Sequence, residues 1–205
     1  MGLLSSTQTI ARYRVEGDLP QSATELVRNG LKKNCITDID NEAQDMAVGW
    51  TDFEAPFTPD FDSATILIGD HFVFGMRVDK KSIPSKVVKQ QVAIESAKRL
   101  AQSDREFLSK NEKKDIKEHV INVLTIRIPP TPNVFDVVWD YSKREVWLFT
   151  TQKAANEEFE TLFNKSFGGL KLTRIFPYTM ADLTFSLSDP QRDLLAGLTP
   201  EDFTE

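Results

Sequence analysis

Residues 109–132 read SKNEKKDIKEHVINVLTIRIPPTP, and this stretch decides the organisation of the chain. Ser109, with Glu112 three positions later, forms the capping-box pattern that begins a helix. The prolines at the end of the stretch are incompatible with a helix interior, so the predicted helix ends before residue 129. Its apolar residues recur at helical spacing and predict one buried stripe, made of Ile116, Val120, Val123 and Leu124.

Lysines gather on one side of the same predicted helix. Four of them stand at i, i+3, i+4 and i+7 and therefore share a face: Lys110, Lys113, Lys114 and Lys117. Like charges four positions apart cost a helix about 0.2–0.5 kcal/mol per pair. Helix stability does not favour this arrangement, whereas a bound polyanion would, and we expect that polyanion to be nucleic acid. The alternative is a solvated helix whose charges only keep the protein in solution.

The charge of the whole chain is distributed in the same uneven way. Residues 77–127 hold 13 Lys+Arg and 7 Asp+Glu, a net charge of +6, within a chain whose net charge is −6. Residues 1–76 carry −7 and residues 128–205 carry −5. The Debye length is only about 8–10 Å at physiological salt. A basic surface on an acidic protein can therefore attract an anion that lies close to it.

The segments on either side of the lysine-bearing helix show strand and helix patterns. Before it we predict six elements: strands at residues 6–15, 46–50, 64–68 and 72–78, and helices at residues 22–34 and 84–101. The strands at 64–68 and 72–78 are expected to pair. After it we predict a hairpin, a helix and a strand, at residues 134–139, 145–150, 151–167 and 170–176. The predicted fold class is α+β, with antiparallel or mixed sheets in which β-α-β-β and β-β-α-β units are joined by a long helical segment.

These patterns divide the chain into four segments. They are an N-terminal α+β unit (1–79), a basic helical segment (80–128), a C-terminal β-β-α-β unit (129–177) and a partly ordered tail (178–205). In the tail, residues 184–187 are predicted as a strand and 190–196 as a short helix. A chain of 205 residues suffices for one compact or two-lobed domain.

Composition narrows the class of protein. The single cysteine, Cys35, excludes an internal disulfide and is typical of the reducing cytosol, so we expect a cytoplasmic protein. No apolar run approaches the roughly 20 residues that span a bilayer, and we expect no membrane contact.

Residues with catalytic chemistry are sparse, so we predict no catalytic residue, no metal ligand and no cofactor. His71 and His119 have no companions at metal-ligand spacing, and phosphate-binding or nucleophile motifs are absent from the sequence. A metal-dependent nuclease is a third alternative, because clustered carboxylates can hold its cations. The pairs Asp60 with Asp62 and Asp38 with Asp40 could supply them, but both pairs fall in predicted loops.

Aromatic residues recur every three or four positions from the end of the strand at 46–50 through the loop that follows it. Their acidic neighbours would repel a phosphate backbone, so base stacking is disfavoured, and packing in the core or contact with another protein chain is the better interpretation. As a protein contact we predict a dimer interface made of Trp50, Phe53, Phe57 and Phe61.

Several motifs resemble, in order and spacing, those of the bacterial RdgC family of recombination-associated DNA-binding proteins. Residues 77–88, RVDKKSIPSKVV, are similar to its strand-to-helix passage, in which a basic pair precedes a hydrophobic–proline step and a valine-rich helix. Residues 109–117 resemble its basic helix start. The further matches are Tyr13-Arg14-Val15, Gly49-Trp50 and the Lys153-Ala154 step that opens a helix. The resemblance extends from about residue 10 to 176.

The resemblance implies a specific function. Family members bind double-stranded DNA with little sequence preference, form a dimeric ring with a basic inner surface, act on the nucleoid and restrain RecA-type recombinases. By position, the implied DNA contacts are Lys80, Lys81, Lys86, Lys89, Lys110, Lys113, Lys114 and Lys117. The chain resembles a short member that lacks the usual C-terminal portion and ends instead in an acidic stretch at residues 201–205.

We therefore expect a sequence-independent DNA-binding protein that forms a homodimer and is no enzyme. Its expected ligand is duplex DNA, with single-stranded DNA as the alternative. Lysine is a flexible point charge that suits phosphates and is poor at bidentate reading of bases. The second hypothesis is a module that binds an acidic protein partner, such as a recombination or replication protein, through the same lysines.

Overall fold

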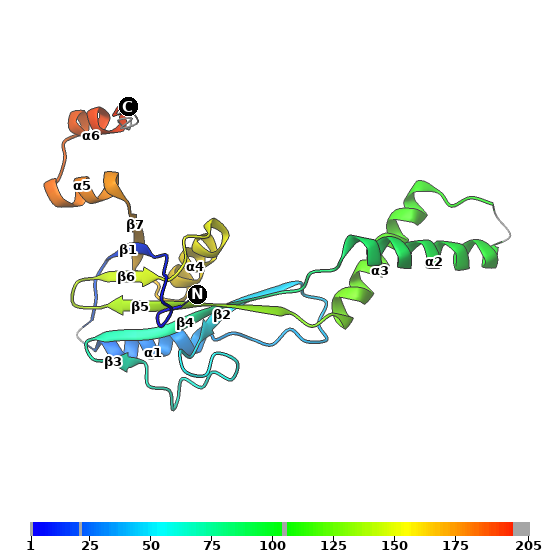
Figure 1. Ribbon diagram of the computed structural model, residues 1–205, viewed down its shortest axis with the longest axis horizontal. Helices are drawn as coiled ribbons and strands as arrows, with labels where there is room; N and C mark the ends of the chain where they lie inside the picture. The colour runs from blue at the N-terminus through cyan, green and yellow to red at the C-terminus, as the bar shows by residue number, and fades with distance from the viewer. Residues whose placement is uncertain (1, 21, 104–105, 199–205) are drawn as a thin grey trace.

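The computed structural model describes residues 2–20, 22–103 and 106–198. Its centre is a curled antiparallel sheet, from which a pair of helices projects to one side (Figure 1). In the described residues the strand order is β2-β4-β5-β6-β1-β7, with the short β3 beside β4. The strands are β1 (Ala11–Glu16), β2 (Met46–Thr51), β3 (Leu67–Ile68), β4 (His71–Lys80), β5 (Thr131–Asp140), β6 (Glu145–Leu148) and β7 (Lys171–Ile175).

The two strand-containing units predicted from the sequence contribute to this one sheet. β4 pairs with β5 along its whole length, from His71 opposite Asp140 to Lys80 opposite Thr131. β1 lies between β6 and β7. A strand from the beginning of the chain is therefore added to the edge of the β5–β6 hairpin, which comes from the second half of the chain. The pairs between named strands are antiparallel, and the predicted α+β class is confirmed.

One face of the sheet carries the main core, because two amphipathic helices cover it. These are α1 (Ala23–Lys33) and α4 (Lys153–Ser166), whose apolar sides pack on inward-facing residues of every long strand. The predicted inward side of α4 is confirmed, since Phe159 and Phe163 are fully buried and Ala155 and Leu162 nearly so. We call the opposite face of the sheet its outer face.

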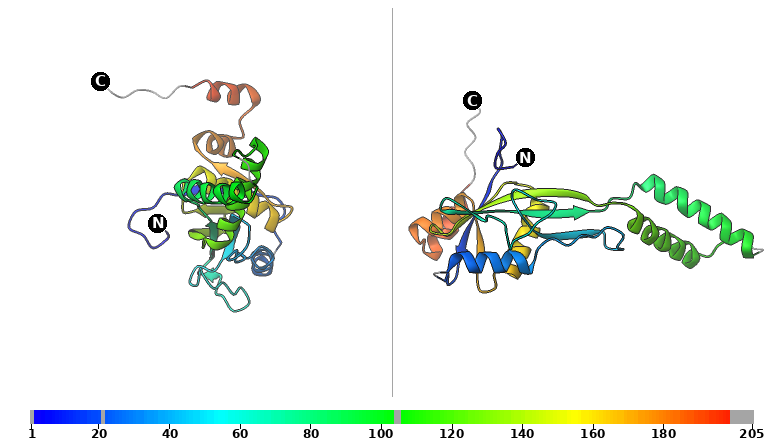
Figure 2. Two further views of the ribbon diagram at one scale, coloured as in Figure 1. Left: turned by 90° about the vertical axis from the view of Figure 1, so that its right-hand side faces the viewer. Right: turned by 90° about the horizontal axis from the view of Figure 1, so that it is seen from below.

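The projecting helices are α2 (Ser85–Ser103) and α3 (Lys110–Arg127), and we call residues 85–127 the arm. They run side by side and lead away from the end of β4 and β5 (Figures 1 and 2). A small separate core joins them, in which Leu108, Ile116 and Val120 are buried. The stripe predicted for α3 is therefore confirmed at two positions, while Leu124 packs partly buried beside them.

The last described elements are two short helices, α5 (Pro177–Phe185) and α6 (Asp189–Ala196). The predicted strand at 184–187 is wrong, because Thr184 and Phe185 belong to α5. Pro177 occupies its first turn, and the Phe176 amide donates to Thr179 Oγ1 (2.9 Å), which begins a helix. The predicted helix at 190–196 is confirmed, whereas residues 199–205 lie outside the described residues.

Candidate nucleic-acid interface

Exposed lysines occupy both ends of the arm. Lys86 and Lys89 lie at the start of α2, beside the sheet, whereas the lysines of α3 lie in its first two turns, at the far end of the arm. A helix rises about 1.5 Å per residue, so the two groups are separated by roughly 20 Å along the arm. The structure therefore distributes the predicted DNA contacts along a rod instead of gathering them at one point.

Most of these ammonium groups are available to a ligand. Lys86, Lys89, Lys110, Lys113 and Lys117 are exposed, and no ion pair within residues 2–20, 22–103 and 106–198 involves them. Their neighbour Lys114 lies 3.7 Å from Glu118, but both side chains are largely exposed and such a pair contributes at most about 1 kcal/mol.

The capping box fixes where the lysine face of α3 begins. The Glu112 amide donates to Ser109 Oγ (3.2 Å), and the Ser109 amide donates to Glu112 Oε2 (2.8 Å). The box predicted from the sequence is thus confirmed, and Glu112 lies at the positive end of the helix dipole, where a carboxylate is stabilising.

Lys81 is not a DNA contact, which corrects one of the predicted sites. Its side chain is buried, and its Nζ donates to the carbonyls of Glu42 (2.8 Å) and Thr125 (2.9 Å). The ammonium group ties the end of β4 to the end of α3 and to the loop before β2, at the base of the arm. Lys80, the preceding residue, points the other way and is exposed, so it remains a predicted contact.

Substitution of Lys81 by methionine should lower the free energy of unfolding by about 2–3 kcal/mol, because the buried carbonyl of Thr125 and the part-buried carbonyl of Glu42 lose their donor. Urea denaturation measures the loss, and Lys80→Met, at the exposed neighbouring position, should change stability by less than about 0.5 kcal/mol. A Lys81→Met protein of normal stability and weakened DNA affinity would contradict the structural role.

The predicted dimer contact is wrong for two of its four aromatic residues. Trp50 and Phe61 are buried in the main core, because inward-facing positions of β2 and the following loop pack beneath α1 and α4. Phe53 packs at the margin of a small cluster on the outer face. Phe57 is 62% exposed and lies 5.6 Å beneath the Arg77 guanidinium, and its contact with a second chain stays a prediction.

The carboxylate pairs considered for a nuclease are engaged within their own loops. Asp60 accepts hydrogen bonds from Ser63 Oγ (2.7 Å) and the Asp62 amide (3.0 Å), and the bond from Ser63 is the main cause that lowers the pKa of Asp60. Asp38 accepts from the Asp40 amide (2.9 Å). In the part of the chain that the structure describes, no three His, Cys, Asp or Glu side chains are grouped to hold a metal ion.

A helix that crosses a membrane must be both long and apolar. Among the described residues, no helix combines the necessary length and hydropathy.

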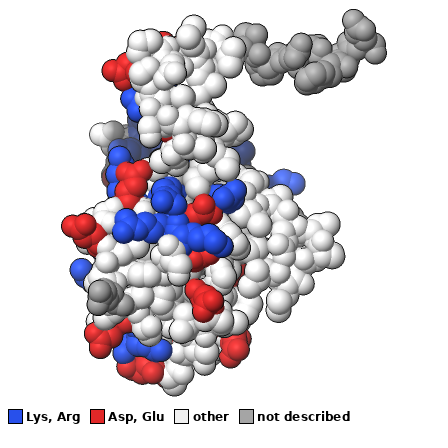
Figure 3. Space-filling model, turned by 90° about the vertical axis from the view of Figure 1, so that its left-hand side faces the viewer, with Lys and Arg blue, Asp and Glu red and all other residues white. Residues whose placement is uncertain are grey.

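Sequence reasoning missed a second basic region, on the body. Figure 3 shows lysine and arginine side chains gathered at the end of the sheet away from the arm. Arg12 and Arg14 point from β1 to the outer face, and Arg14 donates to the carbonyl of Lys143 (2.7 Å), 129 positions away in the sequence. The available signal was the alternation Arg12-Tyr13-Arg14, which places both arginines on the face opposite a buried tyrosine.

A family model described as "Putative exonuclease, RdgC" matches residues 8–187, most of the chain, including the sheet, the arm and α5. None of the individually curated proteins matches the sequence. Membership of this family supports a recombination-associated, DNA-binding role at the level of the family. The match covers 180 of 205 residues in one continuous range, and the chain therefore belongs to the RdgC family.

Proposed function

We propose that this protein binds duplex DNA without sequence preference, through contacts between arm lysines and phosphates. The observation that carries the proposal is the row of exposed lysines on α3, free of ion pairs among the described residues except at Lys114. The arm carries them away from the sheet, while residues 1–76 and 128–205 are acidic (Figure 1). The net negative charge of the body disfavours contact with DNA over most of its surface, apart from the basic region at the end of the sheet, and so favours the arm.

The dimensions of the arm suit a duplex. Phosphates on one strand of DNA recur about every 3.4 Å along the axis, so the roughly 20 Å between the two lysine groups corresponds to about six base pairs. Lysines at both ends can contact phosphates of one duplex that lies along the arm. Because lysine supplies charge without a fixed donor geometry, such contacts do not distinguish base sequences.

The cellular role follows from this mode of binding. A protein that covers DNA irrespective of sequence, associated with the nucleoid in the cytoplasm, would limit the access of a RecA-type recombinase to DNA. A homodimer would double the number of phosphate contacts and prolong binding. A molecular mass measured in solution, with and without DNA, tests the dimer.

Salt tests the electrostatic mechanism. With four or more phosphate contacts, the logarithm of the binding constant should fall with log[salt] at a slope of about −4, from −0.9 per contact. Between 50 and 200 mM salt the affinity should therefore drop by about a hundredfold or more. Fluorescence anisotropy with two duplexes of unrelated sequence measures this, and both should give the same curve. Flat curves, or a strong preference for one duplex, would contradict the mechanism.

The name of the family model favours an exonuclease as the second candidate. Incubation of end-labelled duplex with the protein and Mg²⁺ or Mn²⁺ distinguishes the two, because DNA binding alone leaves the label on full-length DNA. If neither binding nor degradation of DNA occurs, the alternative in which the lysines bind an acidic protein partner is favoured.

A further inference from the structure

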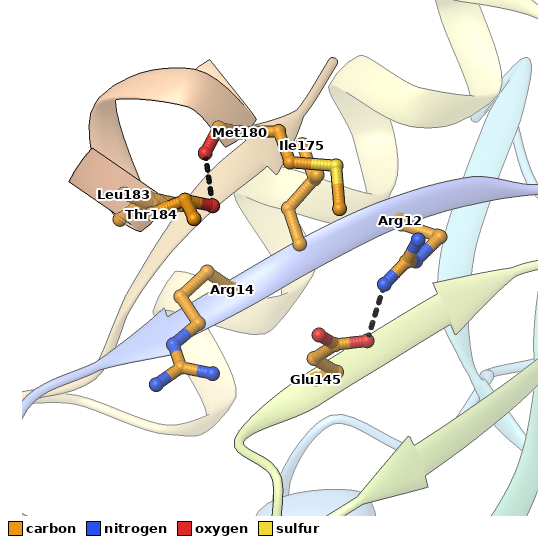
Figure 4. Close-up of a pocket in the computed structure, with 7 residues that line it drawn as sticks. All are labelled: Arg12, Arg14, Glu145, Ile175, Met180, Leu183 and Thr184. Carbon is orange, nitrogen blue, oxygen red and sulfur yellow. Dashed lines mark hydrogen bonds and ion pairs between the residues drawn. The ribbon is translucent and has the colours of Figure 1, made fainter. Parts of the chain in front are cut away.

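A cleft lies between the outer face of the sheet and α5, at the end of the body away from the arm. Its volume is about 210 Å³, and we call it the α5 cleft. Figure 4 shows the two sides: charged residues rise from β1 and β6 below, and apolar residues of β7 and α5 lie above. The charged side comprises Arg12, Arg14 and Glu145, and the apolar side comprises Ile175, Met180 and Leu183.

The charged side retains unused hydrogen-bond donors. Arg12 pairs with Glu145 Oε2 (2.9 Å), yet its Nε–H is buried without a hydrogen-bond partner among the described residues. Burial raises the pKa of Glu145, but hydrogen bonds from Arg12 and Trp147, together with the positive charges of Arg12 and Arg14, outweigh it and lower the pKa overall, so Glu145 is ionised and neutralises Arg12. Arg14 donates only to a backbone carbonyl, and its charge is not matched by a carboxylate in any ion pair of the described residues.

The apolar side is incompletely covered. Met180 and Leu183 are 48% and 46% exposed, and Phe176 and Phe185, which flank them on either side, are also exposed. An apolar surface of this kind next to a charged one is typical of a site that binds another molecule.

We propose that the α5 cleft binds a short acidic segment of a partner protein, in which a carboxylate stands beside an apolar side chain. The carboxylate would accept a bidentate pair of hydrogen bonds from the Arg14 guanidinium, and the apolar side chain would pack against Met180 and Leu183. DNA fits the same cleft less well. Its phosphate backbone carries no apolar side chain to fill the upper side, so Met180 and Leu183 would stay uncovered.

The α5 cleft is independent of the proposed DNA-binding surface. It lies on the opposite end of the sheet from the arm, so a protein bound to DNA through the arm leaves the cleft open (Figure 1). The partner segment would thus bring a second protein to DNA that the arm already holds.

The test uses the full chain and a fluorescein-labelled peptide, Asp-Glu-Phe-Asp-Glu-Leu, in an anisotropy titration. Arg14→Glu and Leu183→Asp should each weaken binding by about tenfold or more, since one reverses the charge and the other places a carboxylate on the apolar side. Two matched controls outside the cleft, Lys171→Glu on β7 and Leu194→Asp on α6, make the same chemical changes at exposed positions and should bind normally. Peptides with amides in place of the acids, or serines in place of Phe and Leu, should bind at least tenfold more weakly.

Circular dichroism melting separates loss of binding from loss of folding in each variant. The proposal is overturned if wild-type protein does not bind the peptide, or if both cleft variants bind it as well as the controls do. It is also overturned if unlabelled random duplex displaces the peptide, because the cleft would then be part of the DNA-binding surface. A variant without the α3 lysines should keep peptide binding, and loss there would place the peptide on the arm.

Discussion

Simultaneous replacement of four arm lysines by glutamate should reduce affinity for random duplex DNA by at least about a hundredfold at 100 mM salt. The residues are Lys110, Lys113, Lys114 and Lys117, which share one face of α3. Each substitution removes a phosphate contact and adds a repulsive charge, so the salt dependence of any residual binding should also become much shallower. The helix should survive, because its capping box and its buried stripe are untouched.

A matched variant separates the position of the lysines from overall charge. Glutamate at Lys33, Lys153, Lys165 and Lys171, which are exposed lysines of the body, changes the net charge by the same amount, from −6 to −14. If long-range attraction to the whole protein governed binding, both variants would lose affinity equally. We expect the body variant to bind within a few-fold of wild type at 100 mM salt, because its charges lie on the body and salt screens their effect on DNA held by the arm.

The largest effect on stability is expected for Trp50→Ala, which should lower the free energy of unfolding by about 3–5 kcal/mol. The indole is fully buried and meets the rings of Phe74 and Phe159 edge to face, at 5.3 and 5.9 Å. Its Nε1–H donates to Ser166 Oγ (2.7 Å), which also accepts from Asn34 Nδ2 (3.0 Å), so truncation leaves a cavity and removes one of the two hydrogen bonds that this hydroxyl accepts. Urea denaturation monitored by circular dichroism measures the loss.

Two further substitutions separate the contribution of the buried ring from that of its hydrogen bond and from that of an exposed aromatic residue. Trp50→Phe keeps much of the ring volume and should cost less than the alanine, because it mainly removes the bond to Ser166, worth about 1 kcal/mol. Phe57→Ala, on the exposed residue of the same aromatic set, should change stability by less than about 0.5 kcal/mol. If Trp50→Ala instead left stability intact and weakened self-association, the indole would be at an interface and its place in the core would be wrong.

Local chemistry made much of the arm predictable. The bounds of α3 follow from Ser109 at one end and from the prolines after residue 128 at the other, and its buried stripe follows from a period of 3.6 residues. The inward face of α4 was predictable for the same reason. The short strand expected at 184–187 failed, because alternation over so few residues does not outweigh a helix begun by Pro177.

The sequence by itself determined the elements, the segregation of charge and the lysine face of α3, since each depends on residues within a few turns of one another. Tertiary structure alone decided which groups remain available. It buried Lys81 against two carbonyls from distant segments, placed Trp50 beneath α1 and α4, and brought Arg14 beside α5 to form a cleft. Burial and long-range pairing depend on which strands become neighbours, and no local pattern encodes that choice.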